Sequence, residues 1–341
     1  MTALIHSPEY GKHETGNHPE NKERIEAIIN SVKESEILSQ IDLFKPDICK
    51  KEDLLRVHTK KHVENIKEIC QRGGGYLDYD TLASPQSYQI AKLSAGGAIT
   101  AAKLVTDGYK SAYSIGRPPG HHATRDRAMG FCIFNNLAIT LEYLRELYKI
   151  KKFLIFDFDA HYGNGTADIF YSDPDVLYIS IHQDPRTIFP GKGFVEEIGM
   201  GKGEGYNLNI PMSPGSTTDD YIYMIERILS PVAQYFNADF YLVDVGFDGH
   251  RDDPLSSINL DDDFYGWIAA ELMEIAGRMA LILEGGYNLP ALSRCNIQLI
   301  NGLNQENNRE HPLPRDNLTV LDDTKNSFKE IKEIFSPFFE F

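Results

Sequence analysis

The sequence has few cysteines, and no two of them are close together. Its 341 residues include four cysteines, at positions 49, 70, 132 and 295. Because no pair has the C-x-x-C spacing, the pattern argues against a disulfide framework and against a thiolate zinc finger. A reducing compartment fits four isolated thiols best, so we expect a cytoplasmic protein.

A long apolar run is also missing. No stretch approaches the roughly 18 consecutive apolar residues that would cross a bilayer. The N-terminal segment has no basic start followed by an apolar run, so we expect neither a secretory leader nor a membrane association. Apolar residues still make up 42% of the chain and charged residues 25%. This composition is typical of a globular protein with a large core.

Positive charge is scarce. The chain has 34 lysines and arginines against 50 acidic residues, for a formal net charge of −16. This field would repel nucleic acid and anionic membranes, so we expect no direct nucleic-acid binding. A cationic substrate remains compatible with it. Many ordinary soluble enzymes are equally acidic, so the charge alone selects no function.

Four apolar runs rich in β-branched and aromatic residues predict buried strands. They cover residues 153–159, 176–182, 240–247 and 279–283, and a weaker run covers 111–115. Segments with helical character lie between them, such as residues 136–148 and 221–235. The alternation predicts an α/β fold with three layers, αβα, in which a central, mostly parallel sheet carries helices on both faces.

The domain organisation follows from what interrupts the pattern. No repeat and no Pro/Ser-rich linker occurs before about residue 303, so we expect one domain spanning residues 1–341. A polar loop is expected at about 303–320. The last residues, 327–341, have the pattern of a short amphipathic helix that packs on the body of the domain.

Each predicted strand runs into a polar, glycine-containing loop. In open parallel sheets, ligands bind beyond the carboxyl ends of the strands, so we expect these loops to converge on one crevice. The loop after the run at 153–159 presents Asp159 and His161, which are two positions apart and share a face of an extended chain. A carboxylate and an imidazole so placed suit zinc, which needs a third protein ligand in a catalytic site.

Two acids compete for the third position. Asp248 follows the apolar run at 240–247, where an acid is costly unless it is paired or bound to metal. Asp244 lies within the same run. The alternative, that these acids cap helices or form salt bridges, is reasonable for any one of them and poor for the whole set.

Two further motifs suggest hydrolytic chemistry. His121 and His122 follow a rigid Pro-Pro-Gly turn, and imidazoles serve well as general base and general acid near neutral pH. Asp157 and Asn164 are available to orient the two rings. Tyr287 follows two glycines after the last predicted strand, where its hydroxyl could donate to an oxyanion.

Together the motifs resemble one family closely. The order RPPGHH, GFC, DFDAHYGNGT, GFD…DPL and EGGYN, from His18 onward, is similar to the histone deacetylase and acetylpolyamine amidohydrolase family, which has the arginase-like fold. The resemblance implies one zinc ion on Asp159, His161 and Asp248. It also implies a catalytic set with the histidine pair and a carbonyl-polarising tyrosine: His121, His122, Tyr287, Asp157 and Asn164.

Within that set, Asn164 stands where many members have aspartate, as in the class II branch. An amide leaves the neighbouring imidazole less basic than a carboxylate would, so we expect His122 to be the general base. Tyr287 is present where the family's regulatory class IIa members have histidine. The resemblance therefore implies an efficient deacetylase.

The same resemblance implies a substrate channel and structural ions. Phe131, preceded by Gly130, and Phe189 match the aromatic walls of a narrow acyl-lysine channel. Asp80 matches a rim acid, although Asp78 could serve instead. Residues that match the family's sites for monovalent cations, K⁺ or Na⁺, are Asp157, Ser180, Phe170, Asp173, Val176 and Tyr206.

These expectations lead to one function with named rivals. The predicted reaction is zinc-dependent hydrolysis of N-acetyl-lysine in proteins or peptides to lysine and acetate. Leu255 follows Asp253-Pro254 where members that prefer acetylpolyamines carry a glutamate, which favours acetyl-lysine over the alternative, an acetylpolyamine or other small acylated amine. An arginase-type ureohydrolase needs a second set of bridging carboxylates. A catalytically silent acyl-lysine binder would require the loss of machinery, and none of the named residues is missing.

Overall fold

The structure, a computed structural model, describes residues 2–304 and 318–341. In this part of the chain the main sheet has eight strands in the order β2-β1-β5-β10-β9-β6-β7-β8. All of its neighbouring strands run parallel. The strands are β1 (Thr2–Ile5), β2 (Ile41–Phe44), β5 (Ser111–Ser114), β6 (Phe153–Asp157), β7 (Val176–Gln183), β8 (Asn207–Met212), β9 (Phe240–Val245) and β10 (Met279–Leu283). A separate antiparallel hairpin joins β3 (Gly75–Tyr76) to β4 (Leu82–Ala83).

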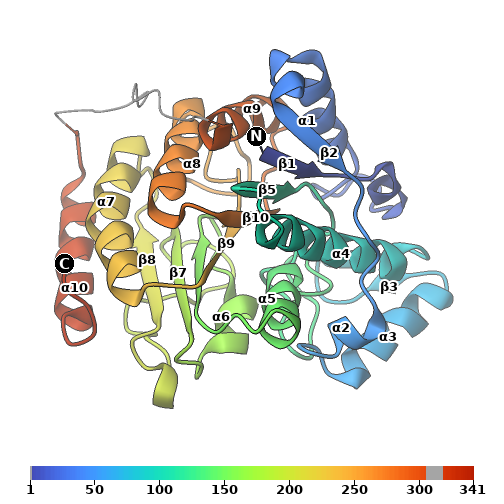
Figure 1. The fold of residues 1–341 in the computed structure, drawn as a ribbon, viewed down its shortest axis with the longest axis horizontal. Helices are drawn as coiled ribbons and strands as arrows, with labels where there is room; N and C mark the ends of the chain where they lie inside the picture. Colours follow the sequence, from blue (N-terminus) through green and yellow to red (C-terminus); the bar gives the residue numbers. More distant parts are fainter. Residues whose placement is uncertain (1, 305–317) are drawn as a thin grey trace.

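Helices cover both faces of the sheet (Figure 1). They are α1 (Glu23–Glu34), α2 (Lys51–Leu54), α3 (Lys60–Gln71), α4 (Ser87–Thr106), α5 (Asn136–Leu147), α6 (Asn164–Phe170), α7 (Thr218–Phe236), α8 (Asp262–Ala276), α9 (Leu289–Asn304) and α10 (Asp322–Phe335). Short polar side chains cap the N-termini of two of these helices, α5 and α7. The Asn135 side chain accepts from the N–H of Ala138 at the start of α5, and Thr217 and Asp220 form a capping box at the start of α7.

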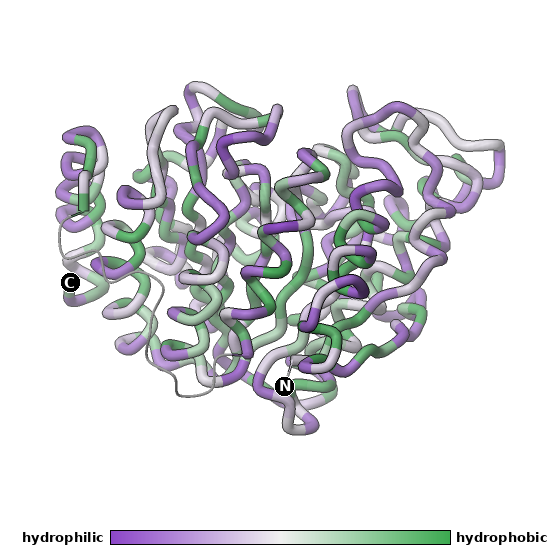
Figure 2. The backbone as a smooth tube through the Cα atoms, turned by 90° about the horizontal axis from the view of Figure 1, so that it is seen from above, coloured by the Kyte–Doolittle hydropathy of each residue, from purple (hydrophilic) through white to green (hydrophobic). Residues whose placement is uncertain are grey.

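Two apolar cores lie on the two faces of the sheet, because alternate residues of a strand point to opposite sides. Leu154 and Phe156 of β6 belong to the core shared with α1, α7, α8, α9 and α10. Phe153 and Ile155 belong to the core shared with α3, α4 and α5. In Figure 2, hydrophilic residues recur around the periphery. The predicted α/β fold with a parallel sheet between two helical layers is confirmed.

The predicted strands all occur, with differences of at most two residues at their ends, and β7 is one residue longer than predicted. β10 has the predicted bounds, whereas β6 and β9 each end two residues early, at Asp157 and Val245. The chain leaves the sheet there and enters the loops that carry Asp159 and Asp248. The short β1 and β2 and the polar, proline-containing β8 have no strong strand pattern, and the sequence analysis did not predict them.

The C-terminal region differs in detail from its prediction. Helix α9 continues to Asn304, and α10 begins at Asp322, five residues before the predicted start. Of the predicted polar loop at 303–320, residues 305–317 lie outside the described residues. Helix α10 lies beside α7 (Figure 1) and buries Ile331 and Phe335 completely. Across residues 2–304 and 318–341, the helices are all too short or too polar to cross a membrane.

Candidate active site

The carboxyl ends of four adjacent strands position the predicted site residues. Asp157 is the last residue of β6, and Asp159 and His161 follow it in the loop. Asp248 lies three residues beyond β9, and Tyr287 lies four residues beyond β10. The histidine pair lies in the loop after β5. Since the strands are parallel, these loops meet at one edge of the sheet, as the sequence predicted.

Asp159, His161 and Asp248 come together as one cluster. One ligand atom from each lies within 4.8 Å of the others. Nδ1 of His161 is 3.3 Å from Oδ1 of Asp159 and 2.7 Å from Oδ2 of Asp248. Asp244, the competing acid, does not join this cluster and lies beside Glu284 instead. The geometry therefore favours Asp248 as the third member.

The surrounding backbone holds the two carboxylates in place. Oδ2 of Asp159 accepts from the N–H of Gly285, and Oδ1 of Asp248 accepts from the N–H of Ala160, both at 2.8 Å. A Cβ at position 285 would come within 2.5 Å of Asp159 Oδ2 and 2.7 Å of Asp248 Oδ2. Glycine is therefore required there. Two fixed carboxylate oxygens and one imidazole nitrogen facing a common point suit zinc, which takes three such ligands in catalytic sites.

The charge balance of the cluster also suits a cation. Burial and the charge of Asp159 raise the pKa of Asp248 to about 7. Burial would lower the pKa of His161, but its hydrogen bonds with Asp159 and Asp248 raise it to about 10. Burial alone would raise the pKa of Asp159, yet His121 and His161 hold it below its ordinary value. Two carboxylates are thus buried close together, and a divalent cation would supply positive charge that stabilises both.

Each histidine of the pair has its own orienting partner. His121 places Nδ1 3.2 Å from Oδ2 of Asp157, which also accepts from the Tyr178 hydroxyl. His122 places Nδ1 2.8 Å from Oδ1 of Asn164. An amide oxygen only accepts, so Nδ1 of His122 carries the proton and Nε2 is free to take one. Both partners are the ones that the sequence analysis named.

The environments of the two rings push their pKa values apart. Burial acts to lower the pKa of His121, but Asp159 and Asp157 raise it to about 10. Burial, together with the charges of His121 and His161, holds the pKa of His122 well below its ordinary value. A pair split in this way contains a proton donor and a neutral base.

Tyr287 is fixed through both its backbone and its ring. Its N–H donates to Oδ2 of Asp253 at 2.6 Å. The guanidinium of Arg24 lies 4.9 Å from the ring centroid, and the ring of Phe131 meets it edge-on at 5.7 Å. Burial raises the pKa of Tyr287 well above its ordinary value, so its hydroxyl keeps its proton and can donate.

Aromatic side chains surround the approach to the histidine pair. Phe189 is 43% exposed and meets the ring of His122 edge-on, with 5.0 Å between ring centroids. Phe131 meets His18 in the same way at 4.4 Å. Gly130 has a φ of 55°, and a Cβ there would come within 2.4 Å of the His122 ring. The structure thus gathers both predicted channel walls around the same site.

The predicted rim residues, Asp80 and Asp78, lie in a turn whose next residue contacts the channel-wall residue Phe131. Asp80 is half-buried and Asp78 is exposed, both in the turn between β3 and β4. Burial and the neighbouring charge of Asp78 raise the pKa of Asp80 above its ordinary value. The next residue, Thr81, accepts from the N–H of Phe131 through its hydroxyl oxygen. Leu255 is half-buried, and its N–H donates to Oδ1 of Asp253.

The residues predicted to hold monovalent cations fall into two groups. Ser180 pairs in register with Asp157, and its hydroxyl lies 2.8 Å from Nδ1 of the buried His182. The other group lies at the amino ends of β7 and β8. There the carbonyls of Phe170, Asp173 and Tyr206 accept from the N–H groups of Asp173, Val176 and Tyr178. A carbonyl oxygen has a second lone pair, so these positions stay a prediction.

Several residues of the site were not assigned a role from the sequence. Arg24 is fully buried and donates to the carbonyls of Glu284 and Gly286, both at 2.6 Å. Arg117 is equally buried and forms a bidentate ion pair with Glu20, each bond 2.7 Å long. Glu20 and Arg24 lie in the charged segment 18–24, and Arg117 lies in the RPPG motif, but the sequence does not show which distant groups they contact.

Comparison with known proteins agrees with this geometry. A histone deacetylase domain matches residues 18–303. A probable deacetylase of Methanothermobacter thermautotrophicus is 44% identical over 99% of both chains. A histone deacetylase-like amidohydrolase of Pseudomonas aeruginosa is 38% identical over 84% of this chain and 76% of its own. The solved structure of the HDA15 HD domain superposes with a TM-score of 0.92 at 32% identity, covering 99% of this chain and 95% of that one. The chain belongs to the histone deacetylase family.

Proposed function

We propose that this protein is a zinc-dependent deacetylase that hydrolyses the amide bond of N-acetyl-lysine in proteins or peptides. The observation that carries the proposal is the cluster of Asp159, His161 and Asp248 beside the histidine pair. These three residues would hold zinc. The ion would supply a Lewis acid that polarises the carbonyl and acidifies the attacking water. Membership of the deacetylase family supports the reaction class.

His122 acts as the general base in this proposal. Its Nδ1–H donates to Asn164, so Nε2 accepts the proton of the attacking water. The amide of Asn164 is itself oriented, because its Nδ2 lies 3.6 Å from the sulfur of Met129. His121, held beside Asp157, keeps its proton and supplies the positive charge and the proton for the leaving amine.

Tyr287 donates its hydroxyl to the carbonyl oxygen as negative charge develops on it. The cation–π contact with Arg24 and the backbone bond to Asp253 fix the ring before substrate arrives. Such preorganisation matters because donors that need no rearrangement stabilise the transition state most.

We further assign the substrate contacts and ions. Phe131, Phe189 and Gly130 would line a channel for the acyl-lysine stem, and Asp80 would bind the substrate backbone at its rim. Leu255 leaves that rim without an extra acid, which favours acetyl-lysine over acetylpolyamine. Structural K⁺ or Na⁺ would bind at the carbonyls of Phe170, Asp173, Val176 and Tyr206 and near Asp157 and Ser180. Archaeal and bacterial relatives support a cytoplasmic location.

Acetylpolyamine hydrolysis is the second candidate. The net charge of −16 would attract a polycationic amine as well as a basic peptide. The name of the Pseudomonas relative, an amidohydrolase, is compatible with either substrate. An arginase-type reaction with two metal ions has less support, because Asp244 lies away from the cluster that would have to bind the second ion.

The deciding experiment compares turnover of acetyl-lysine peptides with that of acetylputrescine and acetylspermidine on the zinc-loaded enzyme. We expect a higher kcat/KM for the peptides. A preference of about tenfold or more for the polyamines, a difference of about 1.4 kcal/mol, would overturn the acetyl-lysine assignment and keep the deacetylase. No release of acetate from any of the three would overturn the deacetylase itself.

A further inference from the structure

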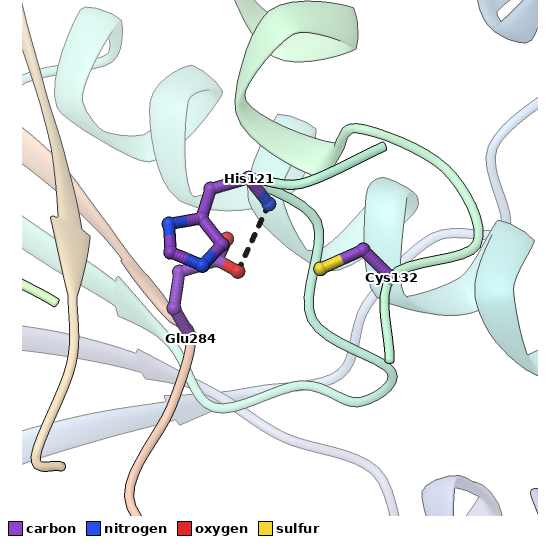
Figure 3. A group of neighbouring side chains, drawn as sticks. All are labelled: His121, Cys132 and Glu284. Atoms are coloured by element: carbon purple, nitrogen blue, oxygen red, sulfur yellow. Dashed lines mark hydrogen bonds between the residues drawn. The ribbon is translucent and has the colours of Figure 1, made fainter. Parts of the chain in front are cut away.

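Glu284, the residue after β10, contacts the backbone of the histidine loop. Its side chain is fully buried. One carboxylate oxygen, Oε2, accepts from the N–H of Gly120 at 2.7 Å and from the N–H of His121 at 3.1 Å. Figure 3 shows the second of these bonds, which joins the end of β10 to the loop that carries the two catalytic rings. A single carboxylate thus holds two successive peptide groups.

The position of Glu284 is itself fixed from two sides. Its own carbonyl accepts from the buried guanidinium of Arg24. On the adjacent strand, Asp244 pairs in register with Ile282, so Asp244 and Glu284 lie on the same face of the sheet. Asp244 is fully buried too. The carboxyl group of Glu284 therefore has little freedom to move.

In the described part of the chain, the two neighbouring acids have carboxyl oxygens that lack hydrogen-bond donors. Within the described residues, no donor reaches Oε1 of Glu284 or either carboxyl oxygen of Asp244. Burial raises the pKa of Glu284 to about 7, against the opposing charge of His121. Burial and Glu284 raise the pKa of Asp244 well above its ordinary value. A proton carried by Asp244 would let it donate to Oε1 of Glu284, which leaves Oε2 as an acceptor for the loop.

Cys132 completes the group drawn in Figure 3; the three side chains lie close enough together to hold a metal ion, but their hydrogen bonds go to other partners. Nδ1 of His121 is bound to Asp157, and the thiol of Cys132 donates to the carbonyl of Gly130. Oε2 of Glu284 is already occupied by two N–H groups. The contacts of Glu284 are therefore with the backbone, and a structural effect on the loop is what they can produce.

We propose that Glu284 is a positioning residue for the deacetylation reaction, which it controls by fixing the backbone of Gly120 and His121 and thereby the placement of both rings. This inference rests on the proposed function. Displacement of a catalytic group by about 1 Å lowers rates by about 10²-fold even when the changed residue is remote from the chemistry. Because the side chain of Glu284 accepts from the backbone of Gly120 and His121 and not from the predicted metal ligands or channel walls, metal binding and KM should depend on it little.

Two conservative variants of Glu284 separate the effect of its side-chain length from the effect of its charge. Glu284→Asp keeps the carboxylate but shortens it by one methylene, which withdraws it from the two N–H groups. Glu284→Gln keeps the reach, because its amide oxygen accepts from the loop while its NH₂ donates to Asp244. As a control, Glu142→Asp shortens a partly buried glutamate on α5 that pairs with Arg145 at 2.7 Å, away from the site.

The measurements are kcat and KM on an acetyl-lysine peptide, zinc content and thermal midpoint for the three variants and the wild-type enzyme. We expect Glu284→Asp to lower kcat by about 10- to 100-fold, with zinc content unchanged and KM changed by less than about threefold. Glu284→Gln should recover most of the lost kcat. Glu142→Asp should match the wild type.

The other possible results each contradict either the positioning role of Glu284 or the proposed function. Wild-type kcat in Glu284→Asp, or a loss in Glu284→Gln as large as in Glu284→Asp, would overturn the positioning role. A loss of zinc in parallel with kcat would also overturn it, because the effect would then act on the metal. A wild-type enzyme that binds zinc and releases no acetate would refute the proposed function instead, before any variant is compared.

Discussion

At the scale of single residues, Tyr287 offers a clean test of transition-state stabilisation. Tyr287→Phe removes only the hydroxyl, while the ring keeps its contacts with Arg24 and Phe131. We expect kcat to fall by about 10²-fold, as the loss of one oxyanion donor usually causes. Zinc content and KM should change little. Steady-state kinetics with metal analysis checks this, and near-wild-type turnover would remove Tyr287 from the mechanism.

Asp248 and Asp244 form a matched pair of acids on one strand and the loop that follows it. Asp248→Ala removes a member of the cluster and should abolish retention of zinc, since two ligands hold the ion poorly. Asp244→Asn should retain the ion, because Asp244 faces Glu284 and not His161. Zinc content after gel filtration separates them. Full occupancy in Asp248→Ala would show that the third ligand is misassigned.

The buried His58 should make the stability of the fold depend on pH. It is buried, Nδ1 lies 2.9 Å from the carbonyl of Thr124, and Nε2 accepts from the N–H of Asn135 at 2.9 Å. Only the neutral ring can do both. Burial, reinforced by His62, lowers its pKa from 6.5 to about 3. Between these values the unfolded chain binds the proton and the folded protein does not, so the free energy of unfolding falls as pH drops below 6.5.

Below pH 6.5, His58 should lower the free energy of unfolding by up to about 1.4 kcal/mol for each pH unit. His58→Gln offers one donor and one acceptor without titrating, so its stability should fall less steeply with acid. Urea unfolding of the wild type and of His58→Gln at pH 7 and pH 5 measures how much stability each protein loses. The contributions of all other titrating groups are the same in both proteins and cancel in the comparison. Equal slopes for the two proteins would mean that His58 is not held neutral.

The candidate site residues that could be predicted from the sequence are those whose signal is local. Asp159 and His161 were predicted from their spacing at a strand end alone. The histidine pair was predicted from its place after the Pro-Pro-Gly turn. Asp248 was the preferred third ligand, but it rested more on family resemblance than on spacing, because Asp244 on the same run competed with it. Glu284, Arg24 and Asp253 were given no role, since their partners are backbone groups that only the folded chain brings near. A hydrogen bond between Glu284 and Gly120 leaves no periodic signal at either position.

At the scale of elements, helix α10 shows how a terminal segment contributes to the core. Phe335 and Ile331 are fully buried on it, and Thr324 donates to Asp220 at the start of α7. We expect Phe335→Ala to destabilise the protein by about 3–5 kcal/mol, the usual cost of such a cavity. The half-buried Phe338→Ala should cost clearly less. Denaturant unfolding compares them, and equal small losses would mean that α10 packs loosely.

The elements that were predicted are those with strong patterns. The apolar runs of β6, β7, β9 and β10 lie inside the sheet and are buried on both faces, so hydrophobicity alone marks them. β2 and β8 are the edge strands, and β8 carries Asn207, Asn209 and Pro211. Asn207 and Asn209 are buried and donate to backbone carbonyls, so β8 has no apolar pattern from which it could be predicted.

At the scale of the whole molecule, the strand order could not come from the sequence. β5 lies between β1 and β10, although β10 follows β5 by more than 160 residues. Local patterns predict that strands exist and that they run parallel, but the neighbours of each strand depend on how the whole chain packs. The convergence of the loops was still predictable, because any parallel sheet brings its carboxyl ends to one edge.

In the proposed function, a single zinc ion at Asp159, His161 and Asp248 supports amide hydrolysis. Its most direct test is titration of metal-stripped protein with zinc while acetate release from an acetyl-lysine peptide is measured. We predict that activity rises linearly and saturates at one zinc per chain, and that Asp248→Ala stays inactive throughout. Saturation only at two metal ions per chain, or full turnover by protein shown to contain no metal, would contradict the account.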